Sequence, residues 1–322
     1  ANCGQVKNLE IDFFGGEPLL NLDVVRDTVR YGKKCADKLG KTINFTLTTN
    51  AVLLTEEIMD FLLAEHIALI LSLDGRQEVN DACRVSSSGK GSYDLVLPRI
   101  QMAVAKNPHS YYVRGTFTKK NLDFGRDLEH LIECGFTNVS LEPAVGGAEG
   151  YAIGEADLPR VLQEYEQLAG ILWDYYLRGK EVNFFHFNID FERGPCLAKR
   201  VTGCGAGVEY LAVTPKGEIY PCHQFVGNQD YLMGDIYKGL RNTEVRGLFA
   251  ENQLFFKEDC RTCWARHYCG GGCAANAYFE NGDLKKPSQV SCAMQRKRIE
   301  CAIWLETQKR LLAEETNHNI PR

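Results

Sequence analysis

Residues 8–21 read NLEIDFFGGEPLLN, and this stretch decides how the first part of the chain folds. Its apolar run at 9–14 is rich in β-branched and aromatic residues, as strands are. Gly15-Gly16-Glu17-Pro18 follows, and Pro18 can both end a strand and open a helix. Helical periodicity then runs over residues 21–39, so the stretch predicts a strand, a tight turn and a helix.

The same alternation continues to residue 177. Further strands are predicted at 43–48, 68–73, 111–118 and 138–141, and helices over 56–66, from Ser92 onward, over 124–134 and over 158–177. Thr55 suits the N-cap of the second helix, and Gly135 suits the residue that ends the fourth. Strands that alternate with helices at this spacing predict βαβ units and a parallel sheet of five strands in an α/β fold.

The composition changes after residue 194, where the chain becomes rich in Gly and Cys. Short strands are predicted at 209–214 and 218–220, joined by a turn at Pro215-Lys216-Gly217. A last helix is predicted over 291–313. These changes predict two domains, residues 1–185 and residues 186–322.

Composition and charge narrow the class of protein. The 322 residues are 44% hydrophobic and 25% charged, which is ordinary for a soluble globular protein. A formal net charge of -5 gives no bulk attraction to nucleic acid or to anionic membranes. The sequence has no apolar run long enough to span a bilayer, and residues 1–10 do not resemble a signal peptide. We therefore expect a cytoplasmic protein whose partners are neither nucleic acid nor membrane.

Thirteen cysteines are unevenly distributed along the chain. Nine of them crowd the second part: Cys196, Cys204, Cys222, Cys260, Cys263, Cys269, Cys273, Cys292 and Cys301. An odd total, the lack of a secretory signal and CxxC spacing favour metal ligation over disulfides. The CxxC pair Cys260 and Cys263 can converge on one metal centre from a tight loop.

Spacing alone leaves the metal open, because a CxxC pair fits structural zinc as well as an iron–sulfur cluster. His223 and His267 lie near the array but match no Cys₂His₂ zinc pattern. Many cysteines with little histidine fit all-thiolate clusters, and the interleaved glycines permit close approach of the backbone. Ordinary core thiols would not gather at this density.

Polar residues end several predicted strands. Glu17 offers a carboxylate for an ammonium group, and Arg114 offers a guanidinium for a carboxylate. Asn50 and Ser72 close two further strands. Each can equally be a turn or cap residue, and Arg114 can equally form a surface ion pair. Together they would ring the carboxyl-end face of a barrel, where ligands bind.

These residues resemble the radical S-adenosylmethionine (radical SAM) superfamily, in which a GGEP motif holds the amino group of AdoMet. The cysteine array resembles the SPASM extension: Cys204-x12-Gly217-x4-Cys222, Cys260-x2-Cys263-x5-Cys269-x3-Cys273 and a final Cys292. A closer resemblance, to the thioether-forming SCIFF maturases, covers almost the whole chain. Its stretches include FTLTTNAVLL, YYVRGTFTKKNLDF, NFFHFNID, GPCLAKRVTGCGAGVEYLAVTPKGEIYPCHQFVG, CGGGCAANAY and QRKRIECAIW.

The resemblance implies roles for individual residues. Gly15, Gly16 and Glu17 would hold the AdoMet amino group, Ser72 and Arg114 would contact AdoMet, and Asn50 would lie near its ribose. Cys204, Cys222 and Cys273 would ligate a first auxiliary 4Fe–4S cluster, with Cys196 or a substrate cysteine as the fourth ligand. Cys260, Cys263, Cys269 and Cys292 would ligate a second. Cys301 is interpreted as a core residue, and Cys3, Cys35, Cys83 and Cys134 as structural.

The sequence departs from the family in one respect. It lacks the Cx3Cx2C motif, whose cysteines ligate the radical-generating cluster in that family. We expect that the chain is truncated and contains strands two to six of a partial (β/α)6 barrel, so that it is inactive alone. A degenerate, non-catalytic paralogue is the alternative.

For the full-length enzyme, the resemblance implies a maturase of a ribosomally made Cys-rich precursor peptide. A 5′-deoxyadenosyl radical would abstract an α-carbon hydrogen, and a substrate cysteine would close a Cys-to-α-carbon thioether. Flavodoxin or ferredoxin would supply electrons. Two alternatives stay open: a SPASM enzyme of other chemistry, such as an anaerobic sulfatase maturase, and a non-catalytic metal-binding or electron-transfer module.

Overall fold

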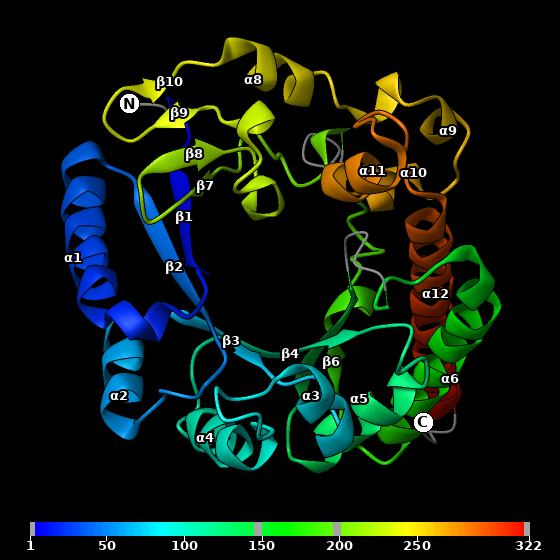
Figure 1. The fold of residues 1–322 in the computed structure, drawn as a ribbon. Coiled ribbons are helices and arrows are strands. Elements are labelled where there is room, and N and C mark those ends of the chain that lie inside the picture. The colour runs from blue at the N-terminus through cyan, green and yellow to red at the C-terminus, as the bar shows by residue number, and fades with distance from the viewer. Residues whose placement is uncertain (1–3, 145–149, 196–200, 319–322) are drawn as a thin grey trace. The chain divides into compact units, whose positions relative to one another are not determined.

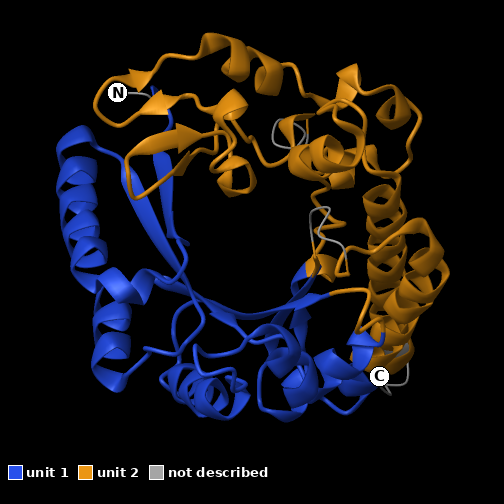
Figure 2. Ribbon diagram, in the orientation of Figure 1, with its two compact units in different colours: residues 1–117, 123–142, 174–185 blue, residues 118–122, 143–173, 186–322 orange. Residues whose placement is uncertain are grey.

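The computed structural model describes residues 4–144, 150–195 and 201–318. The chain packs as two compact units (Figure 2). Unit 1 contains residues 1–117, 123–142 and 174–185, and unit 2 contains residues 118–122, 143–173 and 186–322. The predicted division into a partial barrel domain of residues 1–185 and a SPASM domain of residues 186–322, which would bind two auxiliary clusters, stays a prediction.

Unit 1 is built on a six-stranded sheet in the order β1-β2-β3-β4-β5-β6. The strands are β1 Asn8–Phe13, β2 Thr42–Thr49, β3 Ala68–Ser72, β4 Tyr111–Phe117, β5 Asn138–Pro143 and β6 Asn183–Phe184. The β1–β2, β2–β3, β3–β4 and β5–β6 pairs are parallel, which confirms the predicted α/β fold. All five predicted strands are present. The count of five was one too low, because β6 is only two residues long and too short to show a period.

Helices connect these strands, as parallel neighbours require. They are α1 Leu22–Leu39, α2 Glu56–Ala64, α4 Tyr93–Ala105 and α5 Phe124–Glu133, with an unpredicted short α3 at Gln77–Cys83. The Thr55 hydroxyl accepts a hydrogen bond from the Ile58 amide at 3.3 Å, so its N-cap role is confirmed. Gly135 follows α5 with a φ of 98°, a backbone conformation that favours glycine.

One face of the sheet packs against helices, which Figure 1 shows along the outer side of β1–β4. The rings of Phe13 and Phe45 stack at 6.1 Å on this face. Gly32 of α1 approaches so closely that an added Cβ would lie 3.0 Å from both Ile43 and Phe45. The apolar residues of this face are almost fully buried: Phe45, Leu47, Leu69, Leu71, Val113, Phe117, Val139 and Leu141. Each contributes about 1.5–3 kcal/mol of hydrophobic stabilisation.

Two long helices frame part of unit 2: α6 Leu158–Leu177, whose first sixteen residues belong to the unit, and α12 Gln289–His318. The buried Arg298 guanidinium donates a hydrogen bond to the Tyr165 hydroxyl at 2.8 Å. Lys297 pairs with Glu166 at 2.9 Å. These contacts hold α6 against α12, and α12 extends beyond its predicted limits of 291–313 at both ends.

The rest of unit 2 contains short elements. A four-stranded antiparallel sheet consists of β7 Ala212–Val213, β8 Glu218–Tyr220, β9 Gly234–Asp235 and β10 Gly239–Leu240. The helices are α8 Thr243–Ala250, α9 Glu258–Arg261, α10 Arg266–Cys269 and α11 Ala274–Asn281. Six 3-10 turns complete the described elements of the chain: Pro18–Asn21, Glu155–Asp157, Phe185–Phe187, His223–Phe225, Gln229–Tyr231 and Leu254–Phe256.

The predicted hairpin is present, but its first strand was predicted too long. Gly217 donates its N–H to the Thr214 carbonyl at 2.8 Å, which closes the predicted turn between β7 and β8. The prediction of a strand over 209–214 was wrong at its start. The amides of Glu209 and Tyr210 both turn back to the Gly205 carbonyl, at 2.8 and 2.9 Å, and form a loop.

A hydrophobic cluster holds the short elements together. Phe225 is fully buried, and its ring centroid lies 4.5 Å from that of Tyr231 and 5.4 Å from that of Phe249. Cys222 and Ala274 belong to the same buried cluster. Two distant parts of the cysteine array are therefore fixed by one core. Among the described residues, no helix combines the length and apolarity that crossing a lipid bilayer requires.

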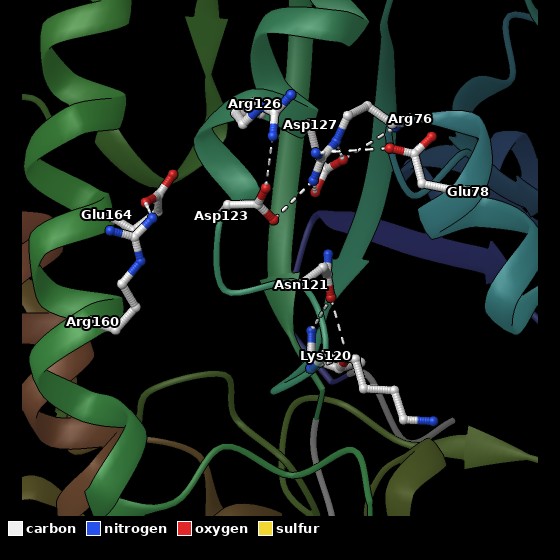
Figure 3. Close-up of polar contacts among 10 residues, drawn as sticks. Arg76, Glu78, Lys120, Asn121, Asp123, Arg126, Asp127, Arg160 and Glu164 are labelled. Atoms are coloured by element: carbon white, nitrogen blue, oxygen red, sulfur yellow. Dashed lines mark hydrogen bonds and ion pairs between the residues drawn. The ribbon is translucent and has the colours of Figure 1, made fainter.

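A buried ion pair joins the loop after β3 to α5. Arg76 donates a hydrogen bond from Nε to the Asp127 carboxylate at 2.8 Å and pairs with Asp123 at 2.8 Å (Figure 3). The Asp127 side chain is fully buried. Gly75 has a φ of 123°, and an added Cβ would lie 2.4 Å from the Asp127 Cβ, so this approach requires glycine.

Replacing Asp127 with Ala should lower the free energy of unfolding by about 3–5 kcal/mol, because the Arg76 charge would be left without its buried partner. Urea unfolding followed by circular dichroism measures the change. Asp27→Ala is the matched control, since the Asp27–Arg30 pair is exposed, and we expect a change within about 0.5 kcal/mol. Equal effects of the two substitutions would contradict the prediction.

Candidate functional site

The sheet of unit 1 has a second, polar face. Strand register places Asp12 of β1 beside Thr46 of β2, and Ser72 of β3 beside Arg114 of β4. Because side chains alternate along a strand, these residues lie opposite the buried apolar face. The residues on the polar face include Glu10, Asp12, Asn44, Thr46, Thr48, Ser72, Tyr112 and Arg114. Such a face can bind a polar ligand through several strands at once.

Glu17 lies at the carboxyl end of β1 and ties it to the end of β2. One carboxylate oxygen accepts hydrogen bonds from the Thr49 hydroxyl at 2.8 Å and from the Leu19 amide at 3.1 Å. The other accepts from the Asn50 amide at 2.8 Å. A carboxylate has about four lone-pair positions, so one remains for an external donor. The structure therefore brings Glu17 and Asn50 together, as a shared ligand site would require.

Gly15 and Gly16 are exposed next to Glu17. Gly15 has a φ of 48°, in the left-handed region that favours glycine. Without side chains, both residues present their backbone groups to any ligand that reaches the strand end.

Arg114 lies over the ring of Phe14, with its guanidinium carbon 5.7 Å from the ring centroid. It also attracts the carboxylate of Asp12, which accepts a hydrogen bond from Thr48. Displacement of water by the surrounding protein raises the pKa of Asp12, although the side chain stays reachable by solvent, and Arg114 and Thr48 oppose that rise. Sequence analysis missed Asp12, whose signal was the alternation of polar and apolar residues in β1.

Not every polar strand end is available for a ligand. Asp74, after β3, receives two hydrogen bonds from the Arg84 guanidinium, at 2.7 and 2.9 Å. It also accepts one from the Thr116 amide at 2.9 Å. Asp74 is buried and fastens β3 to β4, so its role is structural.

The predicted ligands of the two auxiliary clusters are called set I (Cys204, Cys222 and Cys273) and set II (Cys260, Cys263, Cys269 and Cys292) from here on. Burial, with a smaller contribution from the neighbouring thiols of Cys273 and Cys204, raises the pKa of Cys222 to about 11. Burial likewise raises the pKa of Cys292 to about 11, with Cys269, Cys260 and Cys263 adding to the shift. The thiols within each set therefore act on one another electrostatically. The eleven cysteines of the described residues are free thiols.

Turns and helix ends position set II. The Cys263 amide donates to the Cys260 carbonyl at 3.3 Å, which closes the CxxC turn. Cys269 is the last residue of α10, and Cys292 lies in the first turn of α12.

Set I comes from more distant segments. Cys222 is the N-cap of the 3-10 turn that follows it, and Cys273 is the N-cap of α11. Only Gly270, Gly271 and Gly272 separate Cys273 from Cys269, and all three have a positive φ, of 76°, 90° and 75°. A glycine loop therefore links the two sets.

The donor chemistry tests which metal centre the sets fit. In the part of the chain that the structure describes, no three His, Cys, Asp or Glu side chains converge on the position of a single ion. A lone zinc would need its thiolates at about 2.3 Å. Iron–sulfur clusters are held by Cys thiolates, and the seven members of sets I and II are all cysteines.

Histidine adds little to either set. The ring nitrogens of His223 contact the Tyr210 hydroxyl at 3.2 Å and the Gln224 amide at 3.3 Å. The all-thiolate sets fit iron–sulfur clusters best. Cys196, the candidate fourth ligand of set I, and Cys3 lie outside the described residues.

A groove of about 750 Å³ lies between α1 and α2, lined by Arg26, Arg30, Lys33, Lys34, Asp37, Phe61 and Glu65. It contains none of the predicted site residues and borders helices on the outer side of the sheet. We assign it no part in the candidate site.

We compared the sequence with protein-family models and with known proteins. No protein-family model matches the chain. An uncharacterized protein of Archaeoglobus fulgidus is 26% identical over 300 residues, which cover 86% of this chain and 65% of the relative. A cysteine-type anaerobic sulfatase-maturating enzyme of Clostridium novyi is 24% identical over 302 residues. The match covers 86% of this chain and 76% of that enzyme. The radical SAM cyclopropyl synthase TigE of Paramaledivibacter caminithermalis is 24% identical, over 90% of this chain and 59% of its own length.

Solved structures show the same fold. The structure described as native anSMEcpe with bound AdoMet matches with a TM-score of 0.73 at 20% identity, over 98% of this chain and 85% of that one. SuiB of Streptococcus suis bound to its precursor peptide SuiA matches with a TM-score of 0.56 at 17% identity, over 88% of this chain and 65% of that one. The predicted radical SAM fold is confirmed. Two of the three named relatives, the sulfatase-maturating enzyme and the cyclopropyl synthase, are enzymes, which supports the prediction of an enzyme.

Cys301 should behave as a core residue rather than a ligand. It is 5% exposed, and burial raises its pKa to about 12. At pH 8 about one thiol in ten thousand would be ionised, and this fraction rises about tenfold per pH unit. In the metal-free chain, iodoacetamide should label exposed Cys83 long before Cys301, as mass spectrometry of a digest would show. Equal labelling rates would contradict the assignment.

Proposed function

We propose that this protein is a radical SAM maturase that closes Cys-to-α-carbon thioethers in a ribosomally made, Cys-rich peptide. The observation that carries the proposal is the spacing of seven cysteines, which matches the SPASM pattern. The electrostatic interactions of Cys222 and of Cys292 with other cysteines of their own sets support it. The fold of unit 1 and the relatives named above support the same class of enzyme.

In unit 1, the polar face would bind AdoMet. The free acceptor position of Glu17 and the exposed backbone of Gly15 and Gly16 suit the ammonium group of its methionine part. Arg114 suits its carboxylate, because a guanidinium can bind a carboxylate through two hydrogen bonds. Ser72 neighbours Arg114, and Asn50 is fixed beside Glu17, where it would contact the ribose.

In unit 2, sets I and II would each hold a 4Fe–4S cluster, and the protein's share is to fix their thiolates and exclude water. When AdoMet and a reduced radical cluster are bound, they supply the 5′-deoxyadenosyl radical that takes one hydrogen from the peptide. The substrate cysteine would lose its thiol proton and the auxiliary clusters, when bound, would accept the remaining electron, so each thioether would remove two hydrogens from the peptide. Flavodoxin or ferredoxin is the proposed source of electrons for the radical cluster.

Anaerobic sulfatase maturation is the second candidate. The Clostridium novyi relative is a cysteine-type sulfatase-maturating enzyme, and a serine-type one from Bacteroides thetaiotaomicron is 23% identical over 84% of this chain. The same polar face and the same two thiol sets would serve that reaction, because it also begins with removal of a hydrogen from a cysteine or serine residue.

Mass spectrometry of the product separates the two candidates. The printed chain has no Cx3Cx2C motif, so the assay uses a form of the protein that carries one, with AdoMet, dithionite and a six-cysteine peptide. Thioether formation should lower the peptide mass by two hydrogens per crosslink and protect those cysteines from alkylation. Conversion of a cysteine or serine to an aldehyde in a sulfatase peptide, with no crosslink in the six-cysteine peptide, would overturn the thioether proposal.

Iron analysis tests the cluster assignment in the chain itself. After anaerobic reconstitution, we expect about eight irons and eight sulfides per chain for two 4Fe–4S clusters. Cys269→Ala should bind about four irons and unfold more easily, because cluster binding is coupled to folding. Cys83→Ala, at an exposed position in unit 1, is the control and should keep all the iron. Two zincs per chain, or full iron in Cys269→Ala, would contradict the assignment.

A further inference from the structure

Lys257 is a buried cation in the cysteine region of unit 2. It is 2% exposed and is among the largest fully buried side chains of the described residues. It lies three residues before Cys260 and caps α9, so it is part of the segment that presents the CxxC pair. Lysine is almost never fully buried unless its charge has partners, so this position needs an explanation.

The ammonium group holds the glycine loop between the two sets. Lys257 Nζ donates a hydrogen bond to the Gly271 carbonyl at 2.7 Å, and both atoms are buried. Gly271 is the middle residue of the loop that joins Cys269 to Cys273. The loop also meets the segment before Cys204, because a Cβ added to Gly203 would lie 2.9 Å from the Gly270 carbonyl oxygen. One lysine therefore fixes the loop that spaces the two sets.

The charge of Lys257 acts on both sets. Cys260, Cys269 and Cys292 of set II and Cys273 of set I all interact electrostatically with it. Burial lowers the pKa of Lys257, and these cysteines oppose that shift. When a metal centre binds, the thiols must be deprotonated, and their negative charges would favour the ammonium form.

We propose that Lys257 is a positioning residue shared by both auxiliary-cluster sites, which anchors the Gly270–Gly272 loop and supplies the buried positive charge beside the thiolates. The proposal rests on the assignment of iron–sulfur clusters to sets I and II. It goes beyond that assignment because Lys257 is not a ligand and does not contact a substrate.

The charge has a predictable consequence for the electron affinity of the clusters. A reduced cluster carries one more negative charge than the oxidised one, so a nearby cation stabilises the reduced state. Loss of the charge should therefore lower the midpoint potential. The effect should be larger for set II, because three of the four interacting cysteines belong to it.

The test compares anaerobically reconstituted Lys257→Met, Lys257→Arg and Lys238→Met with the unaltered chain. Met keeps the length and apolar stem of lysine without the charge, and Arg keeps the charge. Lys238 is exposed in the turn between β9 and β10, so its substitution is the matched control. Iron content, sulfide content and EPR-monitored redox titration are measured for each protein, and no substrate is needed.

Lys257→Met should lower the midpoint potential by at least the ~59 mV that corresponds to a tenfold change in a one-electron equilibrium. Lys257→Arg should lie closer to the unaltered chain, and Lys238→Met should match it. Full iron and unchanged potentials in Lys257→Met would overturn the proposal.

If Lys257→Met binds no iron, recovery of iron in Lys257→Arg supports the cationic role, whereas loss in both variants would overturn it in favour of simple packing. Failure of the unaltered chain to bind iron would instead refute the cluster assignment on which the proposal rests.

Discussion

The carboxylate of Glu17 is the constraint on which the arrangement of unit 1 depends. It accepts hydrogen bonds from the Thr49 hydroxyl and the Asn50 amide, which join the end of β1 to the end of β2, and from the Leu19 amide in the turn after β1. In the turn that follows β1, Gly15 and Gly16 are exposed. The residue that the motif assigns to ligand binding thus also builds the site. Removal of the Glu17 carboxylate would disturb the backbone of the site and would also remove the proposed contact with the ligand. Substitution by alanine therefore cannot separate the structural role of Glu17 from its ligand-binding role.

Unit 2 depends on a different kind of constraint. Its strands are only two or three residues long, and its helices other than α6 and α12 span eight residues or fewer. Short elements cannot bury enough apolar surface to specify one arrangement by themselves, although one aromatic cluster around Phe225 organises part of the unit. Positive-φ glycines and the buried Lys257 fix the loops that present the thiols. Cluster binding would then add its free energy to the stability of this part of the chain.

Sequence reasoning predicted the regular elements of unit 1 because strong periodic signals specify them. The five longer strands, the Thr55 cap and the Gly135 helix end were all predictable in this way. It failed where structure depends on contacts distant in sequence: β6, the loop at Gly205 and the burial of Lys257. The alternation of polar and apolar residues in β1 indicates which face of the sheet Asp12 lies on, but its interaction with Arg114 depends on the register of the strands. The spacing of the cysteines and the family resemblance predicted the two sets. The spacing of residues does not predict the hydrogen bond from Lys257 to Gly271, in the loop that links the sets.

The two proposed functions would use the same polar face and the same cysteine sets, and the fourth ligand of set I could distinguish them. Both begin with hydrogen removal from a peptide residue, which the polar face of unit 1 would serve equally. If only the three described cysteines of set I were ligands, a substrate cysteine could supply the fourth thiolate and would be held there for thioether formation. If Cys196 were the fourth ligand, set I would be complete without the substrate, and the bound group would serve electron transfer alone. Under the proposed assignment, the fourth ligand of set I would therefore favour either thioether formation or sulfatase maturation.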